Sequence, residues 1–136
     1  MRIKKLVSNI IIVVLSFFLV TGIIFLISEI GSYGTDYYEK EEPFLYAIQG
    51  KDYPRLLEIS YYNRVVDQEK SDKYSEYHGI ADYFEAASYY RAYKENKEKE
   101  KEERMKRQME EAKERMGDYS YLQEEIHEIL GIDEIK

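Results

Sequence analysis

The stretch YYRAYKENKEKEKEERMKR, residues 89–107, changes abruptly from tyrosine-rich to almost wholly charged. Residues 94–115 hold nine Lys and Arg and eight Glu, so the net charge of this segment is only 9 − 8 = +1. A tract that binds nucleic acid or anionic lipid needs an excess of one sign. The charged segment therefore predicts a solvated helix, and nucleic acid is not expected as a partner. The net charge of −7 for the whole chain points the same way.

The spacing of these charges favours a helix. A Glu precedes a Lys or Arg by four residues in Glu95–Lys99, Glu100–Arg104, Glu102–Lys106, Glu103–Arg107 and Glu111–Arg115. Each pair contributes ~0.2–0.5 kcal/mol to an isolated helix. No Gly or Pro follows Tyr93 before Gly117. We therefore expect one continuous helix from Asp72 to Met116, about 67 Å long at 1.5 Å per residue, with residues 94–116 as its charged part.

The N-terminal segment predicts a membrane anchor. Residues 10–27 read IIIVVLSFFLVTGIIFLI without a charge, and the uncharged run extends back to Leu6. A helix over this run would span about 33 Å, which matches the ~30 Å hydrocarbon core of a bilayer. We therefore expect a transmembrane helix over residues 6–28, with the lipid bilayer as a partner.

Flanking charges predict the orientation of this helix. Basic residues precede it and acidic residues follow it, so the positive-inside rule places residues 1–5 in the cytoplasm. Residues 29–36 form a linker, and residues 37–136 form an extracytoplasmic domain. An alternative is a cleaved signal peptide over residues 1–34, which would make the mature protein a secreted helical one.

The domain after the linker is expected to be all-α, because strict alternation of apolar and polar residues is absent. A first helix begins near Glu41 and stops at Gly50, and a second begins at Tyr53 and forms a hairpin with it. The long helix follows from Ser71 onward, and a short last helix ends at Gly131.

Apolar spacing predicts which faces are buried. The expected core residues are, in the first and second helices, Phe44, Leu45, Ile48, Tyr53, Leu56, Leu57, Tyr61 and Val65; in the long helix, Tyr74, Tyr77, Ile80, Ala81, Phe84 and Ala87, with a second stripe of Tyr83, Ala86, Tyr90 and Tyr93; and in the last helix, Leu122, Ile126, Ile129 and Leu130.

The segments YAIQGKDYPRLLEI and YHGIADYFEAASYYRAYKE resemble the helix–turn–helix pattern of tetratricopeptide repeats. The resemblance covers about residues 38–95, and the turn Gly50-Lys51-Asp52-Tyr53 has one residue more than the repeat pattern. It implies helical hairpins and a role in protein interaction.

Few residues point to chemistry. The chain has no cysteine, and no phosphate-binding loop or nucleophile motif occurs. His78 is expected to be solvated. Glu124 and His127 have a spacing found in di-metal helical bundles, but they lie off the apolar face. No catalytic residue, metal or cofactor is therefore expected, and we do not expect an enzyme.

The tyrosines and methionines are the candidates for an interaction surface. Tyr62, Tyr89, Tyr90 and Tyr93 could present aromatic rings to a partner, a peptide or a glycan, although tyrosines also fill small cores. Met105, Met109 and Met116 form a thin apolar seam, with Ala112 among them. This seam could pack on the chain's own last helix, through Leu122 and Ile126, or on a second chain as a short coiled coil.

These patterns predict a single-pass membrane protein with a small helical domain that acts in protein interaction, as an accessory or scaffold subunit. A protein partner or a homodimer is expected. The alternative is a module that binds a peptide or glycan on tyrosine-rich helix faces. Heavy use of Ile, Lys, Glu and Tyr is typical of an AT-rich bacterial genome.

Overall fold

The computed structural model describes residues 15–16, 18–27, 37–66 and 71–133. The chain divides into two compact units, Met1–Tyr37 and Tyr38–Lys136. In the first unit, residues 18–27 are helical, and large apolar side chains such as Phe18 and Ile24 are more than half exposed.

A helix that could cross a bilayer by itself is not present among the described residues. The expected transmembrane helix, residues 6–28, lies partly outside them, since residues 6–14, 17 and 28 are not described. The expected tail, residues 1–5, and most of the linker also lie outside. The anchor therefore stays a prediction.

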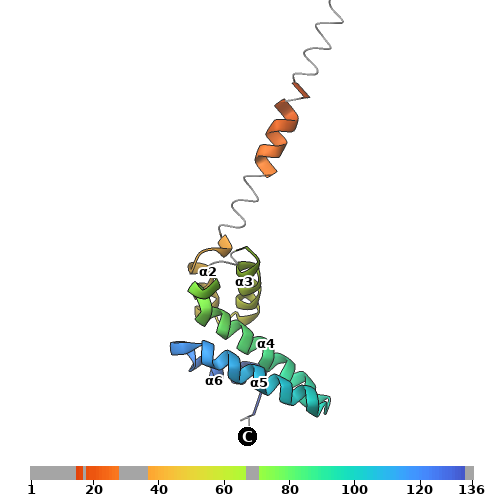
Figure 1. The fold of residues 1–136 in the computed structure, drawn as a ribbon, viewed down its shortest axis with the longest axis vertical. Coiled ribbons are helices and arrows are strands. Elements are labelled where there is room, and N and C mark those ends of the chain that lie inside the picture. The colour runs from red at the N-terminus through yellow and green to blue at the C-terminus, as the bar shows by residue number, and fades with distance from the viewer. Residues whose placement is uncertain (1–14, 17, 28–36, 67–70, 134–136) are drawn as a thin grey trace, which may run out of the picture. The chain divides into compact units, whose positions relative to one another are not determined.

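The second unit is all-α over its described residues, as predicted (Figure 1). Its elements are α2 (Glu42–Gln49), α3 (Tyr53–Val66), the 3₁₀ helix η1 (Ser71–Tyr74), α4 (Ser75–Glu95), α5 (Lys99–Arg115), the 3₁₀ helix η2 (Gly117–Tyr119) and α6 (Leu122–Leu130). The third predicted helix thus begins as the short turn η1, and its α-helical part starts at Ser75.

Helices α2 and α3 form the predicted hairpin. Pro43 lies in the first turn of α2, where its missing N–H costs nothing. After Gly50, Lys51 adopts a left-handed φ of 54°, and Asp52 N–H donates to the carbonyl of Ala47. This is a Schellman ending, which reverses the chain into α3.

The buried face of α3 differs from the predicted one. Tyr61 and Val65 were expected in the core but are 64% and 56% exposed. Ser60 and Asn63 are buried instead, because a buried histidine on α4 bonds both side chains. The prediction from apolar periodicity was wrong here, because hydrogen bonds to His78 decide which face of α3 is buried.

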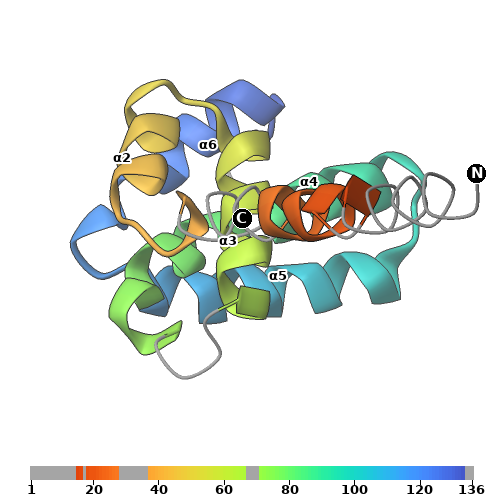
Figure 2. The same cartoon turned by 90° about the horizontal axis from the view of Figure 1, so that it is seen from above.

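The predicted continuous helix from Asp72 to Met116 is wrong, because the helix breaks at residues 96–98. Lys97 has a φ of 60°, its N–H donates to the carbonyl of Lys94, and Glu98 N–H donates to the carbonyl of Tyr93. These two bonds are again a Schellman ending, with Lys in the place usually taken by Gly. It turns α5 back along α4, so that the two helices lie side by side (Figure 2).

Packing of α5 on α4 explains why the break is favoured. The buried residues of α5 and its C-terminus are Met105, Met109, Ala112 and Met116. A left-handed non-Gly residue costs about 1–2 kcal/mol, whereas burying three methionines contributes roughly 5 kcal/mol or more. The methionine seam therefore packs on α4, which was neither of the two predicted alternatives. A Cβ added at Gly79 of α4 would lie 2.9 Å from backbone atoms of Arg115 and Met116, so Gly79 permits this close approach.

Helix α6 also packs on α4. Leu122 and Ile126 are buried as predicted, but Ile129 is 49% exposed. Polar contacts hold the same face: the Tyr53 hydroxyl donates to Glu125, and His127 Nε2 lies 2.8 Å from the Tyr83 hydroxyl. His127 is half-buried, with its ring stacked on that of Tyr83 at the edge of this face.

Candidate functional site

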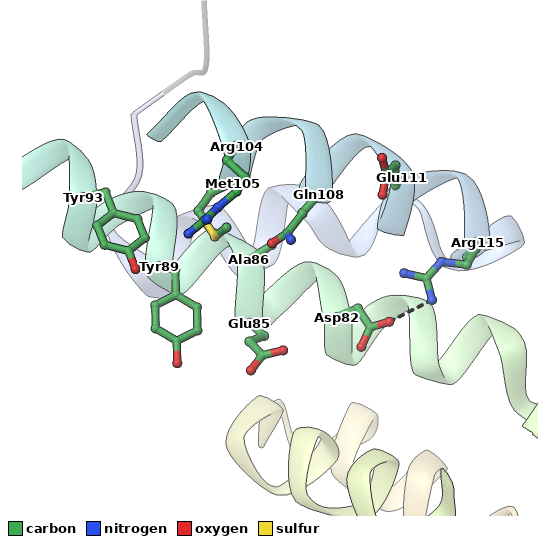
Figure 3. Close-up of a pocket in the computed structure, with 10 residues that line it drawn as sticks. All are labelled: Asp82, Glu85, Ala86, Tyr89, Tyr93, Arg104, Met105, Gln108, Glu111 and Arg115. Carbon is green, nitrogen blue, oxygen red and sulfur yellow. Dashed lines mark hydrogen bonds and ion pairs between the residues drawn. The ribbon is translucent and has the colours of Figure 1, made fainter. Parts of the chain in front are cut away.

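An open groove of about 530 Å³ runs between α4 and α5, and we call it the α4–α5 groove (Figure 3). Its lining residues are Asp82, Glu85, Ala86, Tyr89 and Tyr93 from α4 and Arg104, Met105, Gln108, Glu111 and Arg115 from α5. The break at residues 96–98 creates this groove, because it brings together two segments that a continuous helix would hold apart.

One end of the groove is braced by an ion-pair cluster. Both carboxylate oxygens of Asp82 accept hydrogen bonds from Arg64 of α3, at 2.9 and 2.8 Å. Arg115 donates to the same carboxylate at 2.8 Å (Figure 3). The cluster is partly exposed, so each contact contributes little alone, but the bidentate geometry fixes three helices relative to one another.

The middle of the groove carries polar side chains with no internal partner. In the described part of the chain, no hydrogen bond or ion pair joins Glu85, Arg104, Gln108 or Glu111 to another side chain. All four are exposed. Their donors and acceptors are therefore available to a bound molecule.

Two tyrosines line the α4 side of the groove. The rings of Tyr89 and Tyr93 are stacked, with centroids 6.2 Å apart and planes 18° from parallel. Tyr89 is 50% exposed, and the ammonium of Lys101 lies 5.2 Å from the Tyr93 ring centroid. A flat aromatic surface beside unpaired charged groups suits binding rather than bond-breaking chemistry.

The predicted surface residues fall into two groups. Tyr89 and Tyr93 line the groove, and Tyr62 is 44% exposed on α3, where its ring lies 4.9 Å from that of Tyr38. The others are at most 5% exposed and belong to the core of this chain; these are Tyr90, Met105, Met109 and Met116. Their burial follows from the packing of α5 on α4.

The prediction that His78 is solvated is wrong, since the side chain is 3% exposed. Asn63 donates from Nδ2 to the carbonyl of Tyr38 at 2.6 Å, so its Oδ1 accepts from His78 Nε2 at 3.0 Å. His78 Nδ1 then accepts from the Ser60 hydroxyl at 2.6 Å. The chain of bonds defines a neutral imidazole with its proton on Nε2.

Burial, with a smaller contribution from Arg64, lowers the pKa of His78 to about 4. Serine, histidine and asparagine also occur together in hydrolytic sites, but Ser60 is only 1% exposed and a histidine with this pKa is a weak base. The trio acts as a polar connection between α3 and α4. Nearby in α6, burial also lowers the pKa of His127.

Sequence reasoning missed the polar half of the groove. Arg104, Gln108, Glu111 and Arg115 were read as part of a solvated face, although they recur at intervals of four, three and four residues. This interval places them on one side of a helix. The spacing shows that these four residues share one side of α5, but it does not indicate that α4 lies beside that side.

Searches of protein-family models, curated proteins and solved structures found no match to this chain. The fold itself provides the helical hairpins that the tetratricopeptide resemblance implied, while membership of that family stays a prediction.

Proposed function

We propose that this protein is a single-pass membrane protein whose helical domain binds a protein partner, as an accessory or scaffold subunit on the outer face of a bacterial membrane. The N-terminus lies in the cytoplasm in this proposal. The supporting observation is the α4–α5 groove, which combines an exposed tyrosine with charged side chains that lack internal partners.

The chemistry of the groove favours a protein partner. Interfaces are enriched in Tyr and Arg, and Tyr89, Tyr93 and Arg104 line the groove. The cluster around Asp82 holds the walls in place, so the groove exists before binding and less entropy is lost on association.

Site-specific photo-crosslinking of the membrane-embedded full chain tests this proposal. Tyr89 is replaced by p-benzoylphenylalanine, and Tyr46, an exposed tyrosine on α2, is replaced in a matched control. We expect a stoichiometric protein adduct from position 89 and little from position 46. Equal adducts from both positions, or none from position 89, would contradict an interaction surface at the groove.

A second candidate is a module that binds a peptide or glycan, favoured by the stacked Tyr89 and Tyr93 rings in a groove of ligand-like volume. A thermal-shift screen of sugars and peptides tests it. Stabilisation that is lost on Tyr89→Ala supports this candidate, and no stabilisation by any member of the panel counts against it.

A further inference from the structure

The outward charges of α5 have a property that goes beyond a binding surface in general. Arg104 and Glu111 are equidistant from the midpoint between Arg107 and Gln108, because 104 + 111 = 215 and 107 + 108 = 215. Glu100 and Arg115 share this midpoint, since 100 + 115 = 215. When α5 is turned end for end about this midpoint, each of these acidic positions falls on a basic one and each basic position on an acidic one.

The pattern extends over the whole of α5 and its flanks. Five pairs of charged residues are related by this midpoint, and each joins opposite signs: Lys97 and Asp118, Glu100 and Arg115, Lys101 and Glu114, Glu102 and Lys113, Arg104 and Glu111. Each of the other six pairs in this span joins one charged and one uncharged residue, so no pair joins like charges. A second α5 laid antiparallel on the first would thus meet complementary charges.

Helix geometry places the central members of this pattern on one face. With 3.6 residues per turn, positions 100, 104, 107, 108, 111 and 115 fall within about 100° of one another. All are exposed, and four of the six are on the groove side or in the groove wall. Tyr89 lines the same groove from α4 and is half exposed, so its ring adds apolar area that ion pairs alone lack.

We propose that the partner of the α4–α5 groove is a second copy of this chain, paired through antiparallel α5 helices about a two-fold axis. Arg104 of each copy contacts Glu111 of the other, so the central ion pair forms twice. In such an interface residue i contacts j and j contacts i, which is the symmetry the charges have. This inference rests on the proposed function and names its partner.

The ion-pair partners are free to make these contacts. Within the described part of the chain, Glu100, Arg104 and Glu111 have no ion pair. Arg115 already bonds Asp82, but a guanidinium has five N–H donors and can also reach Glu100 of the second copy.

Charge-swap variants of the full chain in excess detergent test the pairing. In a dimer of the Arg104→Glu variant, the new glutamate of each copy faces Glu111 of the other, which gives two like-charged contacts. In a dimer of the Glu111→Arg variant, the new arginine of each copy faces Arg104 of the other, which also gives two. We expect each variant alone to self-associate about tenfold more weakly than the wild type at low salt. Mixed together, the two variants restore both contacts with opposite signs, so the mixture forms a heterodimer of wild-type affinity.

Matched controls carry the same charge changes away from this face. Lys99→Glu and Glu110→Arg alter exposed positions of α5 whose symmetry-related residues are Met116 and Met105. Neither control is expected to weaken self-association. Circular dichroism establishes that every variant keeps its helix content, and differently tagged chains report pairing by co-isolation.

A wild type that stays monomeric to 100 µM, or a mixture that associates no better than the single variants, overturns the self-pairing. If a crosslink from position 89 then joins a different protein, the interaction role stands without the dimer. If position 89 also gives no adduct, both proposals are overturned.

Discussion

At the residue scale, His78 connects the helices of the second unit. Its two nitrogens bond Ser60 and Asn63 of α3, and Asn63 extends the connection to the Tyr38 carbonyl, at the start of this unit. The Phe44 ring meets the imidazole edge-on at 5.6 Å. Charges around it are Arg64 and Arg115, which disfavour its protonation, and Asp82, which favours it.

This burial predicts a pH-dependent stability. Burial lowers the pKa of His78 in the folded chain to about 4, below the ordinary histidine value of 6.5, so between these pH values the unfolded chain binds a proton that the folded chain does not. The contribution of neutral His78 to the free energy of unfolding is therefore complete above pH 6.5 and is lost as the pH falls towards 4. We expect His78 to account for about 2 kcal/mol of lost stability between pH 7 and pH 5.

Urea unfolding of the wild type and of His78→Gln at both pH values measures this contribution. The variant is expected to be less stable at pH 7 but to lose about 2 kcal/mol less on acidification. His127 remains in both proteins and cancels in the comparison. Parallel pH profiles for the two proteins would contradict a buried neutral His78.

At the element scale, the break at residues 96–98 decides which helices meet. Asn96 is the weakest helix former of its surroundings, and Lys97 takes the left-handed conformation that a Schellman ending requires. Just after the turn, Lys101 pairs with Glu98, the N-cap residue of α5, at the start of the new helix. The low helix propensity at Asn96 thus permits a break in the helix, and the break lets Met105, Met109 and Met116 pack on α4.

Substitution of Lys97 by glycine distinguishes the break from a continuous helix by the sign of its effect. Glycine adopts a φ of 60° without strain, so we expect Lys97→Gly to raise the free energy of unfolding by roughly 0.5–1 kcal/mol. In the interior of a continuous helix the same change would lower it by about 1 kcal/mol.

Chemical denaturation of the full chain in detergent gives this value. Arg107→Gly, at an exposed position in the interior of α5, is the control and should destabilise. Destabilisation by both substitutions would favour the unbroken helix.

At the scale of the whole molecule, the second unit contains its own core. Buried side chains from α2, α3, α4, α5 and α6 form one cluster. Every member of this cluster that the structure describes belongs to the second unit. At the edge of this core, the hydroxyls of Tyr53, Tyr77 and Tyr83 make hydrogen bonds to side chains of other elements. Burial raises the pKa of Tyr83 to about 12. Tyrosine thus fills the core while its hydroxyl joins neighbouring elements.

We therefore expect residues 31–136, expressed without the apolar N-terminal segment, to be soluble and mostly helical. Circular dichroism should give a helical spectrum and a cooperative thermal transition, because the described core cluster is built from residues of the second unit. A chain with coil-like or β-rich signal would contradict the fold.

The sequence by itself determined the helical class, the α2–α3 hairpin, the end of α6 at Gly131 and the chain positions of Leu56, Ile80 and Ile126 in the core. These follow from local periodicity and from turn residues, which act over a few positions. The buried face of α3 escaped prediction where His78 is buried, because the hydrogen-bond partners of His78 lie 15 and 18 residues away in the chain.

Only the tertiary structure decided that the charged helix folds back. Seventeen charges in residues 94–115 favour helix whether or not it is broken, so local energies barely distinguish the two forms. Burial of Met105, Met109 and Met116 against α4 distinguishes them, and that is a contact between distant segments. The α4–α5 groove is the result of this contact, which is why its tyrosines were found from the sequence and its polar wall was not.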